Sequence, residues 1–177
     1  MKLILLILII AGLYILGVSN RFKTLQNSIE ESFSTMDVYL KKRYDLIPNL
    51  VETVKGYAKH EADTLETIVA MRGQATTQER KFKSEEEISG AIRTIFAVAE
   101  SYPDLKADSQ FLNLQENLTK SEEDIAMARK YYNRTIKRYN DAIVKMPRAL
   151  IAERMGLSKM PMWEANENER ENVKVEF

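Results

Sequence analysis

Apolar and small residues recur at alternating spacings of three and four along residues 108–147, and neither glycine nor proline interrupts them before Pro147. This spacing places the stripe on one face of an α-helix and is typical of helices that pack side by side over a long distance. Asp108 is suited to capping the first turn, and Pro147 cannot continue the last one. The pattern predicts one long helix with the buried stripe Phe111, Leu114, Leu118, Ser121, Ile125, Ala128, Tyr132, Thr135, Tyr139, Ala142 and Met146.

A second amphipathic stretch covers residues 19–47, where the spacing is kept by Phe22, Leu25, Ile29, Ser32, Met36, Tyr39 and Arg43. Asp45 is then expected to cap a further helix, because a short carboxylate accepts hydrogen bonds from free N–H groups of a first turn. Pro48 is tolerated in that first turn, and Gly73 is placed just beyond the end of this helix.

Ser84 and Glu87 have the spacing of a capping box, which predicts the start of a shorter helix. Tyr102 and Pro103 end it, because proline lacks the N–H group that a helix needs. Long amphipathic segments joined by short connections predict an all-α fold, an antiparallel four-helix bundle with coiled-coil-like packing.

Residues 3–18 carry no charge and are dominated by leucine and isoleucine. The segment is slightly shorter than the roughly 17–25 residues of a spanning helix, but Lys2 and Arg21 extend its reach by keeping their charges at the membrane surface. We therefore expect a retained, single-pass anchor in the cell membrane. The alternative is a cleaved signal peptide, because Gly17 and Ser19 have the small side chains of a cleavage site.

The positive charges that set orientation are nearly balanced, with Lys2 and the amino terminus on one side of the apolar segment and Arg21 and Lys23 on the other. A formylated bacterial N-terminus would lose its charge, which favours a cytoplasmic position for the remainder of the chain. The predicted organisation is an anchor (1–20), a four-helix bundle (21–147) and a C-terminal tail (148–177).

The tail combines a charged composition with a few large apolar side chains. Met160, Met162 and Trp163 are costly to leave in water, so we expect them to dock on the bundle. Val173, Val175 and Phe177 alternate like a strand, which would suit pairing with a partner's edge strand or a neighbouring copy. The alternative is a mobile terminus.

Composition narrows the possible chemistry. Lysine plus arginine and aspartate plus glutamate both total 26, which argues against nucleic acid as a partner. The chain contains no cysteine, which excludes disulfides and thiol nucleophiles. His60 is the single histidine, which removes multi-histidine metal sites and Ser–His catalysis. We expect no enzymatic activity, no metal and no cofactor.

Several segments resemble the bacterial LemA family, in the same order and spacing from the apolar N-terminus to Pro147. They are residues 41–57 (KKRYDLIPNLVETVKGY), His60-Glu61, residues 102–106 (YPDLK), Phe111, Leu114-Gln115, residues 128–133 (ARKYYN) and Tyr139-Asn140. The resemblance implies a membrane-anchored bundle of long helices in a family whose biochemical activity is not established. One departure is Phe96, near which the family pattern has a tryptophan, and we interpret it as a packing substitution.

Polar residues surround the predicted turn between the first two helices: Arg43, Asp45, Pro48 and Asn49. They would serve either as a recognition surface or, as we favour, as structural residues, with Asp45 as the cap and Arg43 pairing across the turn. Glu61 falls on the buried stripe of its helix and needs a partner there. Arg129 or a buried tyrosine would supply one, and a ligand or acid–base role is the alternative.

The most distinctive group lies on the last long helix: Arg129, Tyr132, Asn133, Tyr139 and Asn140. The two tyrosines lie one heptad apart on the apolar stripe, and the two asparagines lie one heptad apart beside it. Polar residues in such places fix the register of packed helices, because a wrong register leaves their amides unsatisfied. A polar pocket between helices or a contact with a partner is the alternative.

These features predict a membrane-anchored scaffold or adaptor without enzymatic activity. Its expected partners are the lipid bilayer, further copies of itself and other membrane or envelope proteins. One alternative is a ligand-sensing or enzymatic bundle that uses Glu61, Arg129 and the tyrosines. The other is an assembly protein that forms rings or cages at the membrane.

Overall fold

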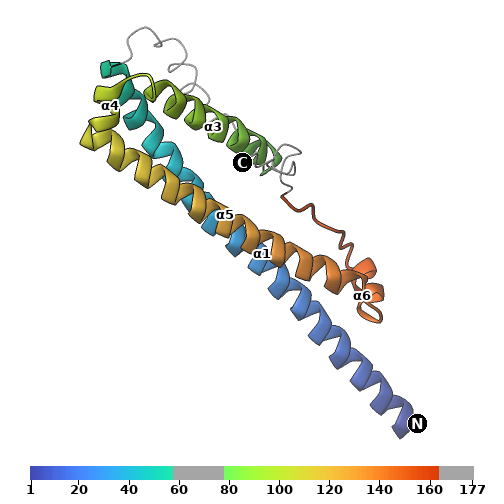
Figure 1. The fold of residues 1–177 in the computed structure, drawn as a ribbon. Coiled ribbons are helices and arrows are strands. Elements are labelled where there is room, and N and C mark those ends of the chain that lie inside the picture. The colour runs from blue at the N-terminus through green and yellow to red at the C-terminus, as the bar shows by residue number, and fades with distance from the viewer. Residues whose placement is uncertain (58–77, 164–177) are drawn as a thin grey trace, which may run out of the picture. The chain divides into compact units, whose positions relative to one another are not determined.

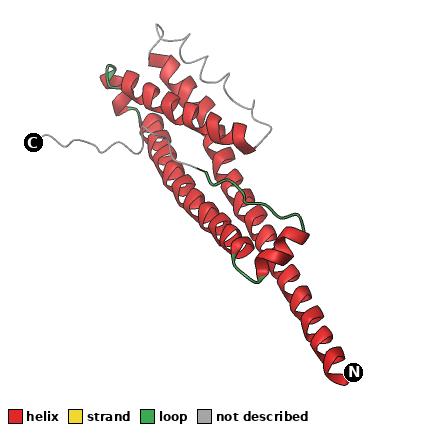
Figure 2. Ribbon diagram, turned by 90° about the vertical axis from the view of Figure 1, so that its right-hand side faces the viewer, coloured by secondary structure: helices red, strands yellow, loops and turns green. Residues whose placement is uncertain are grey.

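The computed structural model describes residues 1–57 and 78–163, and in those ranges the chain forms helices and loops without any strand (Figures 1 and 2). The helices are α1 (Lys2–Tyr57), α3 (Gln78–Ala99), α4 (Pro103–Ala107), α5 (Ser109–Val144) and α6 (Arg148–Arg154). The all-α class is thereby confirmed, while the antiparallel four-helix bundle remains a prediction.

The predicted boundary between the first two helices is wrong. α1 is one helix of 56 residues that passes through Asp45 and Pro48 without ending. Pro48 lacks the N–H group that would donate to the carbonyl of Tyr44. The helix continues because the side chains around the proline are held in a core: Ile47, Leu50 and Val51 are all buried. Most of the stability of a helix comes from such packing rather than from local preference.

The boundaries of α3 also differ from the prediction. The helix begins at Gln78, so Ser84 and Glu87 lie inside it and do not mark its start. It ends at Ala99, and Pro103 then occupies the first turn of the short helix α4. Proline is well placed there, since the first N–H groups of a helix have no partner within it.

The long final helix is confirmed as α5. The side chain of Asp108 caps it by accepting a hydrogen bond from the N–H of Phe111 at 2.9 Å. The helix ends at Val144, shortly before Pro147. The predicted stripe is buried from Phe111 to Ala142, except that Leu114 is partly buried, and Met146 beyond the helix is exposed.

Packing divides the chain into two compact units. The central unit is Ser34–Ala128, and the terminal unit combines Met1–Phe33 with Arg129–Phe177. The core of the central unit comes from α1, α3, α4 and α5: Ile47, Leu50, Val51, Val54, Ile88, Ala91, Ile92, Ile95, Ala99, Leu105, Phe111 and Leu118.

The terminal unit buries Phe22, Leu25 and Ile29 of α1 together with Tyr132 and Tyr139 of α5, among other residues. The rings of Phe33 and Tyr132 lie 6.0 Å apart, centre to centre. The apolar start of α1 is different, because its large side chains are exposed, from Leu3 at 71% to Leu16 at 61%. By length and composition, α1 contains a candidate membrane span.

Candidate interaction sites

In the terminal unit, two asparagines of α5 bind the main chain of a segment that follows α6. The amide of Asn133 donates to the carbonyl oxygen of Trp163 (2.7 Å) and accepts from its N–H (2.8 Å). Asn140 makes the same pair of bonds with Met160, both at 2.9 Å. Figure 2 shows residues 155–163 as a loop that runs back from α6. We call residues 158–163 the docked segment.

The side chain of Trp163 completes this site. Its ring is 8% exposed, and the guanidinium carbon of Arg129 lies 5.7 Å from the ring centre. A cation above an indole ring is attracted by the negative face of the ring. The expectation that the Met–Trp cluster docks is therefore met by Trp163 and by the main chain of Met160, whereas Met162 is 38% exposed.

The structure brings Arg129, Asn133 and Asn140 together through this segment, while the two tyrosines have another position. Tyr132 and Tyr139 are buried at 2% and 1% exposure. Burial raises the pKa of the Tyr139 hydroxyl, and a hydrogen bond with Gln26 opposes that effect. The tyrosines thus belong to the packed face of α5, and the asparagines to its peptide-binding face.

In the central unit, Arg43 is the charged residue with the deepest burial, at 1% exposure. One terminal nitrogen donates to the Ser89 hydroxyl (3.0 Å) and the Glu122 carboxylate (2.6 Å). The other donates to the side chain of Glu85 and to its main-chain oxygen. The Tyr44 hydroxyl also donates to Glu85. Arg43 therefore pairs with α3 and α5, and the predicted pairing across a turn is wrong because the turn does not exist.

Glu85 is 3% exposed, so its charge depends on these partners. Burial raises the pKa of its carboxyl above the ordinary value, and the nearby Arg43 and the Tyr44 hydroxyl counteract part of that rise. Within the described residues, two buried side-chain nitrogen or oxygen atoms have no hydrogen-bond partner, namely Nε of Arg43 and the hydroxyl of Ser121. This cluster is a desolvated charge centre, which is costly unless its geometry is kept intact.

The remaining residues of the predicted turn lie on α1. Asp45 is an exposed residue in the helix interior and does not cap a helix, which corrects the prediction. Asn49 is exposed, and its main-chain oxygen accepts from Thr53 (2.8 Å). Close to the end of α1, the Tyr57 hydroxyl donates to Asp108 (3.0 Å). His60 and Glu61 lie outside the described residues, and so does the predicted pairing of Glu61 with Arg129.

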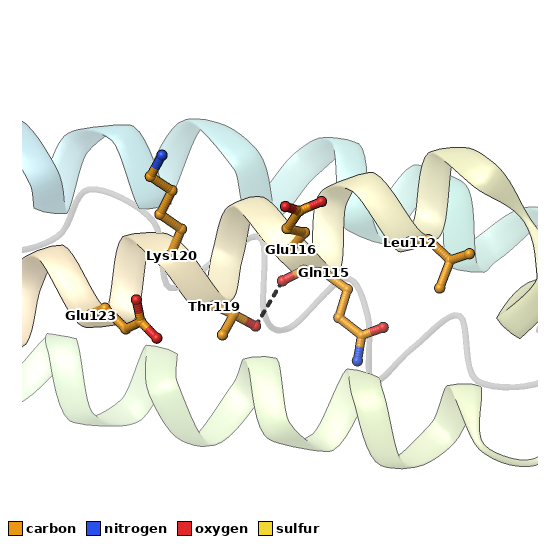
Figure 3. Close-up of a pocket in the computed structure, with 6 residues that line it drawn as sticks. All are labelled: Leu112, Gln115, Glu116, Thr119, Lys120 and Glu123. Carbon is orange, nitrogen blue, oxygen red and sulfur yellow. Dashed lines mark hydrogen bonds between the residues drawn. The ribbon is translucent and has the colours of Figure 1, made fainter.

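The central unit has an open depression of about 510 Å³ along α5 (Figure 3). Its lining comes from one helix: Leu112, Gln115, Glu116, Thr119, Lys120 and Glu123. The Thr119 hydroxyl donates to the main-chain oxygen of Gln115 at 2.9 Å. These side chains point in different directions, so they form a surface groove rather than a convergent polar site. Among the described residues, no group of acidic residues, histidine or cysteine is arranged to hold a metal ion.

Reasoning from sequence missed Glu85, Glu122, Ser89 and Tyr44 as partners of Arg43. A signal existed, because Arg43 falls on the buried stripe and a buried guanidinium requires a carboxylate. The partners of Asn133 and Asn140 were harder to predict from the sequence. They are main-chain atoms, which every residue except proline offers in the same form.

A family model described as the LemA family matches residues 32–177. This chain is also similar to a protein named Protein LemA from Metamycoplasma hominis (strain ATCC 23114). The two are 26% identical over 164 residues, which cover 89% of this chain and 74% of the relative.

Proposed function

We propose that this chain, which belongs to the LemA family, is a membrane-anchored helical scaffold or adaptor that associates with copies of itself. Its partners in this proposal are the lipid bilayer, further copies and other membrane or envelope proteins. The docking surfaces are helix faces, and no enzymatic step is part of the role.

The observation that supports this proposal most is the continuity of α1. Its first turns expose apolar side chains on all sides, as a helix in lipid does. Without a break, the same helix then buries Val18, Phe22 and Leu25 in the terminal unit. A continuous helix of this kind connects the apolar segment directly to the packed residues of the terminal unit, which suits a scaffold.

The alternative of a ligand-sensing or enzymatic bundle receives less support. The two tyrosines proposed for it are nearly inaccessible, and the described depression on α5 contains neither of them. The alternative of rings or cages at the membrane agrees better with α1, since the helix has no break at Ser19 or Asn20. We regard it as one form that self-association would take.

Membrane insertion is tested with the full-length protein by fractionation and alkaline extraction. Leu8→Lys combined with Ile9→Lys places two charges in the apolar segment, and each costs about 2.5–3.5 kcal/mol at the centre of a spanning helix. We expect this variant to leave the membrane fraction. The matched control, Leu8→Ile with Ile9→Leu, preserves the composition and should remain. Equal retention of both variants would contradict the anchor.

The orientation of the chain in the membrane can be tested by labelling an introduced cysteine, because the chain has no cysteine of its own. A single cysteine introduced as Ser158→Cys lies on an exposed position. If the part of the chain after the apolar segment lies in the cytoplasm, a membrane-impermeant maleimide should label this cysteine only after the cells are lysed. Labelling of intact spheroplasts would reverse the proposed orientation.

Self-association is tested by native mass measurement of the full chain in nanodiscs, beside a chain that starts at Arg21. A discrete oligomer that becomes smaller after the truncation would support assembly through the anchor. Monomers in both samples would refute self-association and leave an adaptor for a different protein.

A further inference from the structure

The contacts of Asn133 and Asn140 recognise a peptide main chain rather than particular side chains. Each amide makes two hydrogen bonds to one residue, accepting from its N–H and donating to its carbonyl oxygen. Every extended residue except proline offers the same pair of groups. The asparagine face of α5, defined by these two residues, is therefore built like a site for an extended peptide.

The spacing of the two asparagines matches an extended chain. They lie seven positions apart on α5, which is about 10.5 Å along a helix axis. Their partners Met160 and Trp163 lie three positions apart, which is about 10 Å along an extended chain. An extended segment can thus bind at both asparagines with little distortion.

Selectivity in this site comes from one side chain. Trp163 is buried beside Arg129, whereas Pro161 and Met162 between the two bound residues are exposed. The site therefore recognises two peptide units and one large aromatic ring. A segment that lacks the ring would keep the hydrogen bonds and lose the buried indole.

The docked segment follows a short connection after α6 that contains Gly156. Within the described residues, the last hydrogen bond between main-chain groups before it is that of Leu157 N–H to the Ala152 oxygen (3.0 Å). Gly156 precedes this bond with a φ of 67°, a conformation that glycine adopts without strain. The segment can leave its place by rotation near Gly156, and no helix has to open.

We propose that the asparagine face of α5 also accepts residues 158–163 from a second copy of this chain, so that neighbouring copies exchange these segments. The inference rests on the proposed self-association. A second copy carries a matching ligand, because its segment is identical and contains the required tryptophan. Anchoring in one membrane would raise the local concentration of copies. Exchange of an identical element is also a known low-cost way to join protomers.

The experiment uses Trp163 as the reporter, since it is the single tryptophan of the chain. A donor copy carries Asn133→Ala with Asn140→Ala, which removes its own site and leaves its Trp163 in place. An acceptor copy carries Trp163→Pro, which removes the ring and the N–H that bonds Asn133, and leaves both asparagines. A control acceptor combines all three substitutions. All are full-length chains in the same detergent, with helix content verified by circular dichroism.

The donor alone should emit at longer wavelength than the unaltered protein, because its tryptophan is exposed to water. Adding the acceptor in excess should return the emission toward shorter wavelength, and the control acceptor should not. An unshifted donor would refute the role of the asparagines, and equal effects of both acceptors would refute exchange.

The mass of the same mixtures separates this inference from the proposed function. Oligomers whose emission is insensitive to the acceptor would overturn exchange and leave self-association intact. Monomers in every mixture would overturn both.

Discussion

The two units pair their polar side chains in different ways. In the central unit, the full charge of Arg43 is buried and meets the carboxylates of Glu85 and Glu122. In the terminal unit, the neutral amides of Asn133 and Asn140 bind main-chain groups. A buried charge is compatible with very few partners, because a poor match leaves it desolvated and unpaired. A neutral amide accepts any peptide unit in the right place. The comparison indicates a fixed centre in one unit and an exchangeable contact in the other.

The largest expected effect follows from breaking the charge centre on one side. Glu85→Leu leaves the buried guanidinium of Arg43 with the half-exposed Glu122 as its remaining carboxylate. We expect the free energy of unfolding to fall by about 3–5 kcal/mol, measured by urea titration with circular dichroism. The double variant Arg43→Met with Glu85→Leu should recover most of this loss, since it removes both charges. A double variant as unstable as the single one would show that the charge itself is not the cause.

A smaller and more local effect is expected from the asparagine face. Asn133→Ala with Asn140→Ala removes four hydrogen bonds. Lys159 is exposed within the docked segment, so trypsin can report on release through the fragment that begins at Met160. A loss of about 2 kcal/mol would increase the open population, and with it this cleavage, roughly 30-fold.

The matched control for that measurement is Asn113→Ala with Asn117→Ala. These asparagines are exposed on the same helix, and their amides donate to main-chain oxygens of α5 itself. Cleavage after Lys159 should not change in this control. If it rises equally, the effect comes from a general change in α5 rather than from release of the docked segment.

A third prediction concerns acid, at the start of α5. The pKa of Asp108 is lowered, first by the hydrogen bond from the Phe111 N–H and then by that from Tyr57. A lowered pKa means that the charged cap stabilises the fold above the unfolded value of 3.8, and that this contribution is lost as pH falls through the folded pKa. Asp108→Asn keeps an acceptor for the N–H of Phe111 and removes the carboxyl that titrates. As the pH falls through the folded-state pKa of Asp108, the thermal midpoint of this variant should therefore decrease less steeply than that of the unaltered protein. An unchanged acid profile would assign the effect to other carboxylates.

The smallest effect is expected from Arg129→Met, which keeps an unbranched apolar stem and removes the charge from the ring of Trp163. A cation–π contact is worth about 0.5–1 kcal/mol at exposed sites, so cleavage after Lys159 should rise about two- to fivefold. For Arg129→Lys, cleavage after Lys159 should be intermediate between that of Arg129→Met and that of the unaltered protein. A change as large as that of the double asparagine variant would mean that Arg129 has a further role in the segment.

Helices were predicted well from the sequence where one long periodic pattern of apolar residues covered the whole helix. The stripe of α5 and its Asp108 cap agree with the structure, because periodicity and a local stop signal coincide there. At Asp45 and Ser84 the local signals were equally clear and yet wrong. Apolar side chains around Pro48 are buried on the continuing helix, and tertiary packing outweighed the preference for a cap.

The candidate sites were predictable to different degrees for a similar reason. Arg43 was recognisable as a buried charge from its place on the stripe, although its partners on α3 and α5 depend on the fold. The asparagines were recognisable by their spacing. The segment that they bind could not be predicted, because its contacts are main-chain atoms 20 and 30 positions further along the chain, and nearly every residue type provides such atoms.

The unbroken course of α1 through the terminal unit also fixes an angle. Each residue turns an α-helix by about 100°, since about 3.6 residues complete a turn. In the proposed membrane-anchored form, the side of the apolar segment that faces a given neighbour is therefore set, relative to Phe22 and Leu25, by the number of residues between them. One residue inserted near Ser19 would turn the apolar segment by that angle relative to Phe22 and Leu25. If copies associate as proposed, chain length in this short stretch would determine the direction in which the terminal unit presents its asparagine face to the next copy.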